Sequence, residues 1–253
     1  MNLKDRLYIS TIAPNAYDLA QEFRLGLELA EYCTAYNMDT NPREIDQKIR
    51  SGLSPHQPLF FHGPFSELFP CAIDPLIRQV CHQRFLQSIK KAADLGCQKI
   101  VFHGGFNPLV YFPIWYVEQS PAFWQELLQE VPADVHLYIE NVLEPDPSYL
   151  ADILEAVGDS RLQMCLDIGH AGAYSQLPVQ DWIRRCRHLI GHVHLHNNDG
   201  CTDLHQGLQK GQLPVWELLA QLQEECPAAS ITLEIPDSAQ ARQSVLDLKP
   251  YLS

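Results

Sequence analysis

Six apolar segments of this chain each carry an imidazole or a carboxylate as their last or next-to-last residue, and these are side chains that bind divalent metal ions. Burying such groups at the end of an apolar segment is costly unless they are paired or bound to a metal. Nitrogen and oxygen ligands without thiolates favour Zn²⁺, with Mn²⁺, Fe²⁺ or Co²⁺ as alternatives. The pattern therefore predicts a metal centre, and its six residues are His62, His103, Glu140, Asp167, His194 and Glu234.

Three further candidate ligands follow two of these segments. His170 comes three residues after Asp167, and Asp203 and His205 stand two residues apart. In an extended chain, side chains two residues apart point to the same side, so Asp203 and His205 can reach one ion. With His170 they predict another three-ligand site, and we expect two or three ions per chain. Other histidines are read as structural residues: His82, His136, His188 and His192.

Short apolar runs alternate with helical patterns along the chain and must position these side chains. Each run is apolar on both faces, which is typical of parallel strands covered by helices. The clearest helix has Asp74 as its N-cap and Pro75 in its first turn, and Gly96 ends it. Within residues 31–57 only 42–53 are expected to be helical. The eight runs span residues 7–11, 25–29, 58–62, 99–103, 136–141, 162–167, 189–195 and 230–235.

Eight alternations of strand and helix within 253 residues predict a single (β/α)8 TIM barrel domain over residues 1–253. The structural alternative is a doubly wound open sheet. That fold needs a glycine-rich phosphate-binding turn after its first strand, and residues 11–18 contain no glycine. A barrel brings the C-terminal ends of all its strands around one mouth, so the candidate ligands are expected to converge there.

The formal net charge is −13, and the sequence has no dense basic cluster. Such a chain repels the phosphates of nucleic acids, which makes nucleic acid an unlikely partner. Eight cysteines without a CxxC pair are read as buried or free thiols. No apolar stretch is long enough to cross a membrane, and we expect a cytoplasmic protein.

The order of these motifs resembles the xylose isomerase-like TIM barrel superfamily, from about residue 58 to residue 236. That superfamily includes sugar phosphate isomerases and epimerases and AP endonucleases of the endonuclease IV type. The epimerase-like members imply a single ion held by four of the residues: Glu140, Asp167, His194 and Glu234.

The resemblance to the endonucleases implies three zinc ions instead. His62 and His103 would then hold one ion, Asp167 and His194 would complete a second, and the carboxylates at 140 and 234 would bridge. The third ion would fall to the remaining candidates, His170, Asp203 and His205.

Two departures from the endonuclease pattern weaken that second reading. Endonucleases of this type have a lysine in the segment that corresponds to residues 194–199, and this chain has none there. Gln209 replaces the first of two glycines that end the following loop in that family. The candidate metal ligands thus match those of the endonucleases, whereas the missing lysine, Gln209 and the acidic net charge do not.

These observations favour a metal-dependent isomerase or epimerase acting on a small sugar, sugar phosphate or hydroxyketone. Glu140 and Glu234 are the expected base and acid. We expect Phe106, in the aromatic segment 106–124, and His196 to contact the substrate. A zinc-dependent phosphoesterase of the AP endonuclease type is the alternative, and a binding protein without activity is a third reading. An oligomer is compatible with the sequence.

Overall fold

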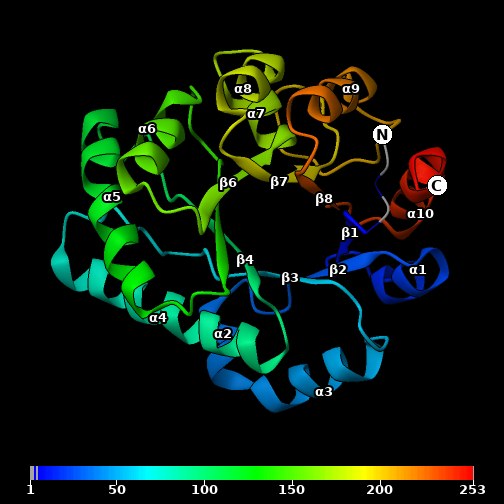
Figure 1. The fold of residues 1–253 in the computed structure, drawn as a ribbon, viewed down its shortest axis with the longest axis horizontal. Helices are drawn as coiled ribbons and strands as arrows, with labels where there is room; N and C mark the ends of the chain where they lie inside the picture. Colours follow the sequence, from blue (N-terminus) through cyan, green and yellow to red (C-terminus); the bar gives the residue numbers. More distant parts are fainter. Residues whose placement is uncertain (1–2, 4, 253) are drawn as a thin grey trace.

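Eight parallel strands close into a barrel in the order of the sequence, and helices surround it (Figure 1). The computed structural model describes residue 3 and residues 5–252. Pairing of β1 with β8, which sets Tyr8 opposite Thr232, closes the sheet and confirms the predicted TIM barrel. The strands are β1 (Leu7–Ser10), β2 (Gly26–Leu29), β3 (Leu59–His62), β4 (Lys99–His103), β5 (His136–Glu140), β6 (Leu162–Asp167), β7 (Ile190–Leu195) and β8 (Ser230–Leu233).

Helices occupy the connections between successive strands. The helix predicted over residues 42–53 is present as α3, whereas the short helix α2 before it was not predicted. The helices are α1 (Ala16–Phe23), α2 (Ala35–Thr40), α3 (Pro42–Gly52), α4 (Pro75–Asp94), α5 (Pro113–Glu130), α6 (Ser148–Val157), α7 (Ile168–Tyr174), α8 (Val179–Cys186), α9 (Val215–Glu225), α10 (Ser238–Leu248) and the 3₁₀ turn η1 (Lys249–Tyr251).

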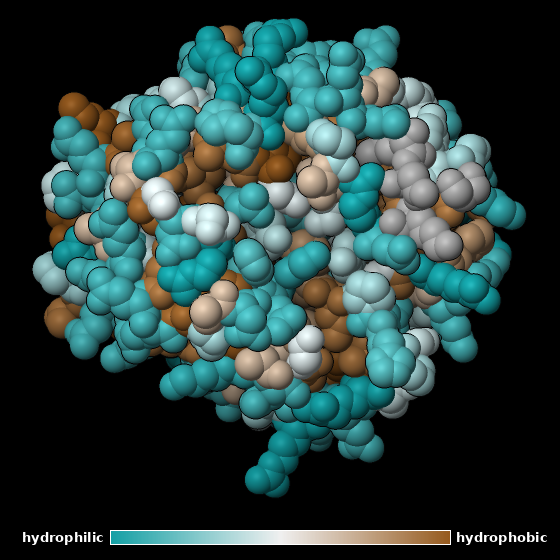
Figure 2. Space-filling model, viewed as in Figure 1, coloured by the Kyte–Doolittle hydropathy of each residue, from teal (hydrophilic) through white to brown (hydrophobic). Residues whose placement is uncertain are grey.

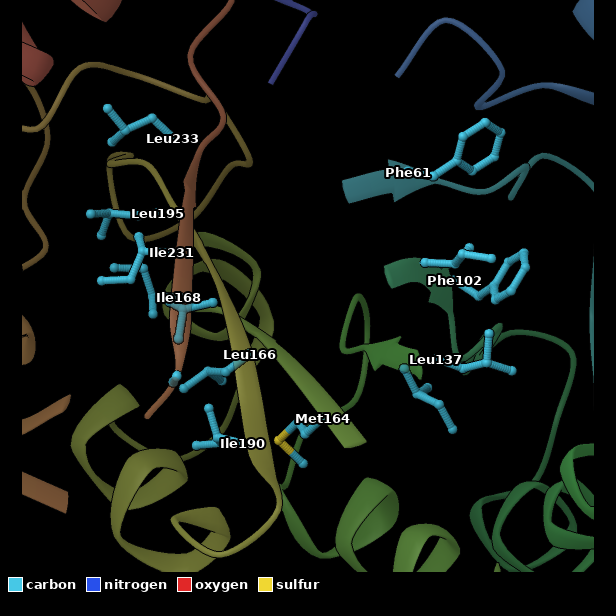
Figure 3. Close-up of a cluster of buried hydrophobic side chains, with 14 of the residues drawn as sticks. Phe61, Phe102, Leu137, Met164, Leu166, Ile168, Ile190, Leu195, Ile231 and Leu233 are labelled. Carbon is cyan, nitrogen blue, oxygen red and sulfur yellow. The ribbon is translucent and has the colours of Figure 1, made fainter. Parts of the chain in front are cut away.

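Alternate residues of each strand face the helices and form the main hydrophobic layer. Successive side chains of a strand point to opposite faces of the sheet, so every second residue reaches the outer side of the barrel. Burying this layer between sheet and helices removes apolar surface from water and stabilises the fold. Figure 3 shows members of the layer, including Phe61, Phe102, Leu137, Leu166 and Ile231.

The remaining strand residues point into the barrel, and their character changes along its axis. A small apolar cluster of Tyr8, Phe60, Val101, Tyr138 and Cys165 fills the interior away from the mouth. On four of these strands, the next inward position lies two residues further along and is the last residue of the strand. These four positions carry His62, His103, Glu140 and Asp167.

The first turn of α4 rests on a side-chain cap. Asp74 Oδ1 accepts a hydrogen bond of 2.8 Å from the backbone N–H of Leu76, as the sequence predicted for this N-cap. We expect Asp74→Ala to lower the free energy of unfolding by about 1 kcal/mol, since the orphan N–H loses its acceptor. Urea unfolding would measure the change, and Asp74→Asn is the matched control because it keeps the acceptor oxygen.

All eight cysteines lie within the described residues and are free thiols, as the absence of CxxC pairs indicated. No helix in the described part of the chain is long and apolar enough to cross a membrane.

Candidate metal centre

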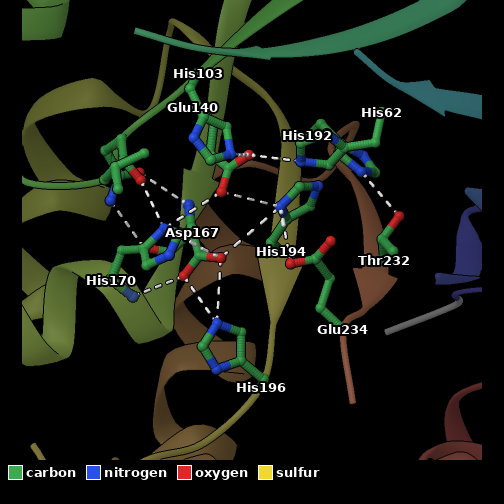
Figure 4. A network of polar contacts seen from close by, with 12 residues as sticks. His62, His103, Glu140, Asp167, His170, His192, His194, His196, Thr232 and Glu234 are labelled. Carbon is green, nitrogen blue, oxygen red and sulfur yellow. Dashed lines mark hydrogen bonds and ion pairs between the residues drawn. The ribbon is translucent and has the colours of Figure 1, made fainter. Parts of the chain in front are cut away.

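The structure gathers the predicted ligands at the barrel mouth (Figure 4). Those on β3 to β6 are the last residues of their strands, and His194 is the penultimate residue of β7. Glu234 directly follows the last residue of β8. These side chains are buried or nearly so, and they face one another because each stands at an inward position of its strand.

Glu140 lies at the centre of this cluster. Its Oε2 is 3.3 Å from His62 Nε2 and 3.4 Å from His103 Nε2. Its Oε1 is 3.3 Å from His170 Nδ1 and 3.4 Å from His194 Nδ1. One carboxylate from β5 therefore touches imidazoles from three other strands and from α7. The ligand atoms of His62, His103 and Glu140 also lie within 4.8 Å of one another, close enough to share an ion.

His194 presents one ring nitrogen to three carboxylates. Its Nδ1 lies 3.4 Å from Glu140 Oε1, 3.5 Å from Glu234 Oε2 and 3.8 Å from Asp167 Oδ2. Ligands held about 2.0–2.2 Å from a tetrahedral zinc ion are roughly 3.3–3.6 Å apart. The distances from His194 Nδ1 to the three carboxylates, which come from β5, from β6 and from the end of β8, are therefore close to those between ligands of one ion.

Unpartnered polar atoms show that this donor set fits a cation. Glu140 Oε2 and His194 Nδ1 are buried and lack a hydrogen-bond partner, and so does Asp203 Oδ1. Such atoms are costly to bury without compensation, and native proteins rarely leave them unsatisfied. Neutral imidazole nitrogens and carboxylate oxygens are first-choice ligands for zinc and related ions. The residues present thus suit a divalent metal.

A second group lies on the loop side of the mouth. Asp203 Oδ2 is 2.9 Å from His205 Nε2 and 3.2 Å from His170 Nε2, so the three residues converge as predicted. The backbone that brings Asp203 and His205 together is not the extended chain that we expected, because His205 has a φ of 45°. Residues other than glycine seldom adopt this left-handed conformation. Backbone curvature at His205, rather than strand-like alternation, brings the two side chains together.

Protons supply the positive charge that neutralises these carboxylates in the absence of a cation. Burial by itself would lower the pKa of His62, but Glu140 raises it to about 9. Burial would also lower the pKa of His205, which Asp203 raises to about 9. Burial lowers the pKa of His103 to about 3, which leaves that imidazole neutral. A bound ion must displace the protons, so metal affinity should rise with pH.

The two candidate catalytic carboxyls have different environments. Burial alone would raise the pKa of Glu140, but the imidazoles of His103 and His194 outweigh it and hold that pKa well below the usual range. Burial raises the pKa of Glu234, and the neighbouring carboxylates Glu140 and Glu28 raise it further. Carboxyls whose pKa values are pushed apart suit separate roles as base and acid.

A cavity of about 630 Å³ opens directly above the ligands. Its polar lining comes from the candidate ligands themselves, and the other walls are apolar except for a thiol. Within the described part of the chain, no lysine or arginine lines it. The lining residues besides the ligands are Ile12, Ala30, Cys33, Phe65, Val142, Leu204 and Pro236.

The two expected substrate contacts are both buried. Phe106 packs against Tyr116 at a ring distance of 5.0 Å and is not part of the cavity lining in the described chain. His196 is fully buried, with Nε2 at 3.2 Å from both carboxylate oxygens of Asp167. Phe65, which the sequence did not single out, lines the cavity instead and stacks on His103 at 4.2 Å. Contact of Phe106 and His196 with substrate stays a prediction.

One buried carboxylate of the cluster was missed in the sequence. Glu28 on β2 is fully buried, and its two oxygens lie 3.0 Å from His194 Nε2 and 3.1 Å from His192 Nε2. The signal was present, because a charged residue inside an apolar strand must find partners. Glu28 is the next-to-last residue of the run 25–29, the position that Glu140, His194 and Glu234 hold in their runs, so the same pattern applied to it but was overlooked there.

Comparison with known proteins places the chain among related barrels. A family model described as a xylose isomerase-like TIM barrel matches residues 20–250. The uncharacterized protein MJ1311 of Methanocaldococcus jannaschii is 26% identical over 204 residues, which cover 76% of this chain and 69% of that protein. A probable endonuclease 4 of Mycobacterium leprae is 25% identical over 179 residues, covering 64% of this chain and 68% of that protein.

Solved structures share the fold over nearly the whole chain. The TTHB071 protein of Thermus thermophilus, soaked with ZnCl2, superposes with a TM-score of 0.77 and 26% identity, covering 97% of each chain. A D-tagatose 3-epimerase-like protein superposes with a TM-score of 0.78 and 20% identity, covering 98% of this chain and 97% of the other.

Proposed function

Because this chain belongs to the xylose isomerase-like TIM barrel family, we propose that it is a metal-dependent isomerase or epimerase of small sugars or hydroxyketones. The observation that carries the proposal is the position of His194 Nδ1, which faces three carboxylates at 3.4–3.8 Å. Two of these carboxylates, Glu140 and Glu234, also border the cavity in which a substrate would sit. Sugar epimerases are among the proteins that share the fold.

The cavity supports an unphosphorylated substrate. Apart from the residues that would hold metal ions, the cavity lining has no lysine or arginine in the described chain that could bind the phosphate group of a sugar phosphate. Apolar walls such as Phe65 and Ile12 offer packing for the carbon side of a sugar ring or chain. We therefore favour neutral ketoses and hydroxyketones over their phosphate esters.

Proton transfer in this reaction falls to the two glutamates. A divalent ion held by the mouth residues would polarise a substrate carbonyl and acidify the neighbouring C–H bond. Glu140, whose pKa is held low, would be ionised and able to take the proton. Glu234, whose pKa is raised, is suited to return a proton on the other side of the substrate. The apolar walls would limit the access of water to the carbanionic carbon.

Deuterium exchange tests the proposal without knowledge of the natural substrate. Metal-loaded protein would be incubated in D2O with a panel of unphosphorylated ketopentoses, ketohexoses and small hydroxyketones. We expect deuterium to enter the carbon next to the carbonyl of at least one compound, as followed by NMR. Exchange should be lost in Glu234→Gln. Hydrolysis of phosphate esters without exchange in any ketose would refute the isomerase proposal.

The second candidate is a metal-dependent phosphoesterase, and the number of ligand groups favours it. Beyond the set around His194, two more groups could each hold an ion: His62 with His103 and Glu140, and His170 with Asp203 and His205. Several adjacent ions suit phosphate ester hydrolysis, because they stabilise both attacking and leaving oxygens. A single-ion isomerase does not need these extra ligands.

Metal stoichiometry tests the metal centre and can exclude the second candidate, because a phosphoesterase of this kind needs adjacent ions, whereas an isomerase needs one ion and is compatible with more. We expect two or three ions per chain by elemental analysis of protein purified from metal-replete cells, because nine ligand residues converge. Replacing His205 with alanine should then remove one ion and leave the rest in place. One ion that depends on His194 and survives His205→Ala would favour the isomerase. If the purified protein contained no metal, the prediction of a metal centre would be wrong.

Binding to DNA is not expected on either reading. Affinity for a phosphodiester backbone depends on lysine and arginine contacts, and this chain has a formal net charge of −13. We predict no measurable binding to duplex DNA containing an abasic site at physiological salt, as tested by fluorescence anisotropy with metal-loaded protein. Specific cleavage of that duplex would move the assignment to the AP endonucleases and leave the fold and ligands unchanged.

A further inference from the structure

Beneath the mouth, one carboxylate connects two buried histidines of β7. Glu28 Oε1 lies 3.0 Å from His194 Nε2, and Glu28 Oε2 lies 3.1 Å from His192 Nε2. The Glu28 carboxylate accepts a third hydrogen bond, from the hydroxyl of Thr232 to Oε2, at 2.5 Å. Glu28, His192 and His194 are fully buried, so no water competes for these contacts.

The hydrogen bonds fix where the proton of each ring lies. An ionised carboxylate can only accept, so Nε2 of both histidines must carry the proton that it donates to Glu28. His192 then accepts at Nδ1 from the Ser230 hydroxyl, 2.7 Å away. His194 in its neutral form then has a free lone pair on Nδ1, the atom that faces Glu140 and has no hydrogen-bond partner.

We propose that Glu28 is a positioning residue that locks His194 in the ring orientation and tautomer that offer Nδ1 to a metal ion. Carboxylates that hold the second nitrogen of a metal-binding imidazole orient the ring and raise its basicity. Glu28 is not part of the cavity lining in the described chain, and both of its oxygens already accept hydrogen bonds from His192, His194 and Thr232, which favours a positioning role over direct coordination. The inference requires that the mouth binds a metal ion and is independent of the reaction that follows.

Glu28→Gln tests this role with little change of volume. Glutamine offers one acceptor oxygen and places an NH2 group against the other Nε2–H donor, so one histidine must change its tautomer or lose its bond. We expect zinc affinity, measured by competition with a chromophoric chelator, to fall about 10- to 100-fold. Nitrogen-15 shifts of the His194 ring in zinc-loaded protein should show loss of the form that is protonated at Nε2 and bound to the ion through Nδ1.

Ser230→Ala is the matched control. It removes a buried hydrogen bond from His192 but leaves the contact between Glu28 and His194 in place. We expect zinc affinity near that of the unmodified protein and an unchanged His194 tautomer. Unchanged zinc affinity and His194 shifts in a folded Glu28→Gln protein would overturn the proposal. Equal losses of affinity in both variants would also overturn it, by indicating general loosening of the barrel.

A separate feature is an apolar patch on the rim of the barrel, where α4 and α5 begin. Leu109 is 94% exposed and Phe112 79% exposed, and hydrophobic side chains are visible along this edge of the molecule (Figure 2). A hydrogen bond connects the start of α5 to the segment before α4: Trp115 Nε1 donates to the backbone carbonyl of Cys71 at 2.8 Å. We call this surface the rim patch; its residues are Ile73, Leu76, Ile77, Val80, Leu109, Val110, Phe112 and Ile114.

The size and charge of the rim patch indicate what covers it. Eight side chains exposed to this extent offer on the order of 500 Å² of apolar surface, at the upper end of what monomers expose. Two copies packed through it would bury roughly 1,000 Å², about the minimum for a specific interface. Residues 104–117 carry no charge, and Asp74 and Arg78 balance each other in 68–81. A contact between two copies through this face would therefore bury no pair of like charges, although each chain has a net charge of −13.

We infer that the rim patch is the contact between two copies of this chain. The expected species in sedimentation velocity at micromolar concentration is a dimer. Phe112→Glu combined with Leu109→Glu should raise the dissociation constant at least 100-fold, because it would bury paired like charges.

The control for this experiment is Leu246→Glu, which changes a partly exposed leucine on α10 outside the rim patch. We expect it to leave the dimer intact, and both variants should keep the circular dichroism spectrum of the parent. A parent protein that is monomeric at 100-fold higher concentration would overturn the inference. So would a dimer that persists in the double glutamate variant, or a monomer that binds neutral lipid vesicles through the patch.

Discussion

Replacing Glu140 by glutamine should abolish turnover and weaken metal binding in the same protein. This carboxylate touches His62, His103, His170 and His194, so its loss removes a shared ligand and the expected general base together. A general base typically contributes about 10²- to 10⁴-fold to the rate, and we expect a loss of at least this size. Single-turnover kinetics with saturating metal would separate the catalytic loss from incomplete occupancy.

The control for Glu140→Gln is the same exchange at a neighbouring buried carboxyl. Glu144 accepts hydrogen bonds from the Tyr116 hydroxyl and the Val142 backbone N–H, and it is not part of the cavity lining in the described chain. Glu144→Gln should keep its ions and most of its activity. A fully active Glu140→Gln protein with normal metal content would show that Glu140 is neither ligand nor base.

Chelation should lower the melting temperature by roughly 5–15 °C. The carboxylates of Glu140, Asp167 and Glu234 are buried at the barrel mouth and that of Glu28 lies beneath them, so they repel one another unless protons or cations neutralise them. An ion present at 100 to 1,000 times its dissociation constant stabilises the folded state by about 3–4 kcal/mol. For a chain of this size, each kcal/mol shifts the melting temperature by about 2–4 °C.

Calorimetry at pH 7.5 with and without a strong chelator would measure this shift. Protein shown to contain metal beforehand should return to its original melting temperature when zinc is restored. The Glu140→Gln variant supplies the control, since its melting curve should respond much less to chelator. Superimposable curves for metal-loaded and chelated parent protein would mean that the mouth does not gain stability from a cation.

The eight strands and the positions of the main ligands could be predicted from sequence because both depend on local patterns. A parallel strand covered by helices is apolar on both faces, so a polar residue that ends such a run is conspicuous. His62, His103, Glu140 and Asp167 are all terminal residues of their strands. Barrel geometry then requires that strand ends meet at one mouth, whatever the sequence of the loops.

The side chains beneath and beside the mouth required the tertiary structure. Glu28 is the next-to-last residue of its strand, as His194 is, so its position was visible in the sequence, but its contacts with His194 and Thr232 depend on the register of the closed barrel. Loop paths likewise decided that Phe65 lines the cavity while Phe106 packs against Tyr116.

What the sequence determined by itself is therefore the chemistry at the strand ends, since it follows from residue type and a period of two. Which ring nitrogen of His194 faces the cavity, and which aromatic borders it, depend on contacts between segments far apart in the chain. Glu28 and His194 are 166 residues apart, and local periodicity carries no information about such a pair. Only the closure of the barrel brings them to hydrogen-bonding distance.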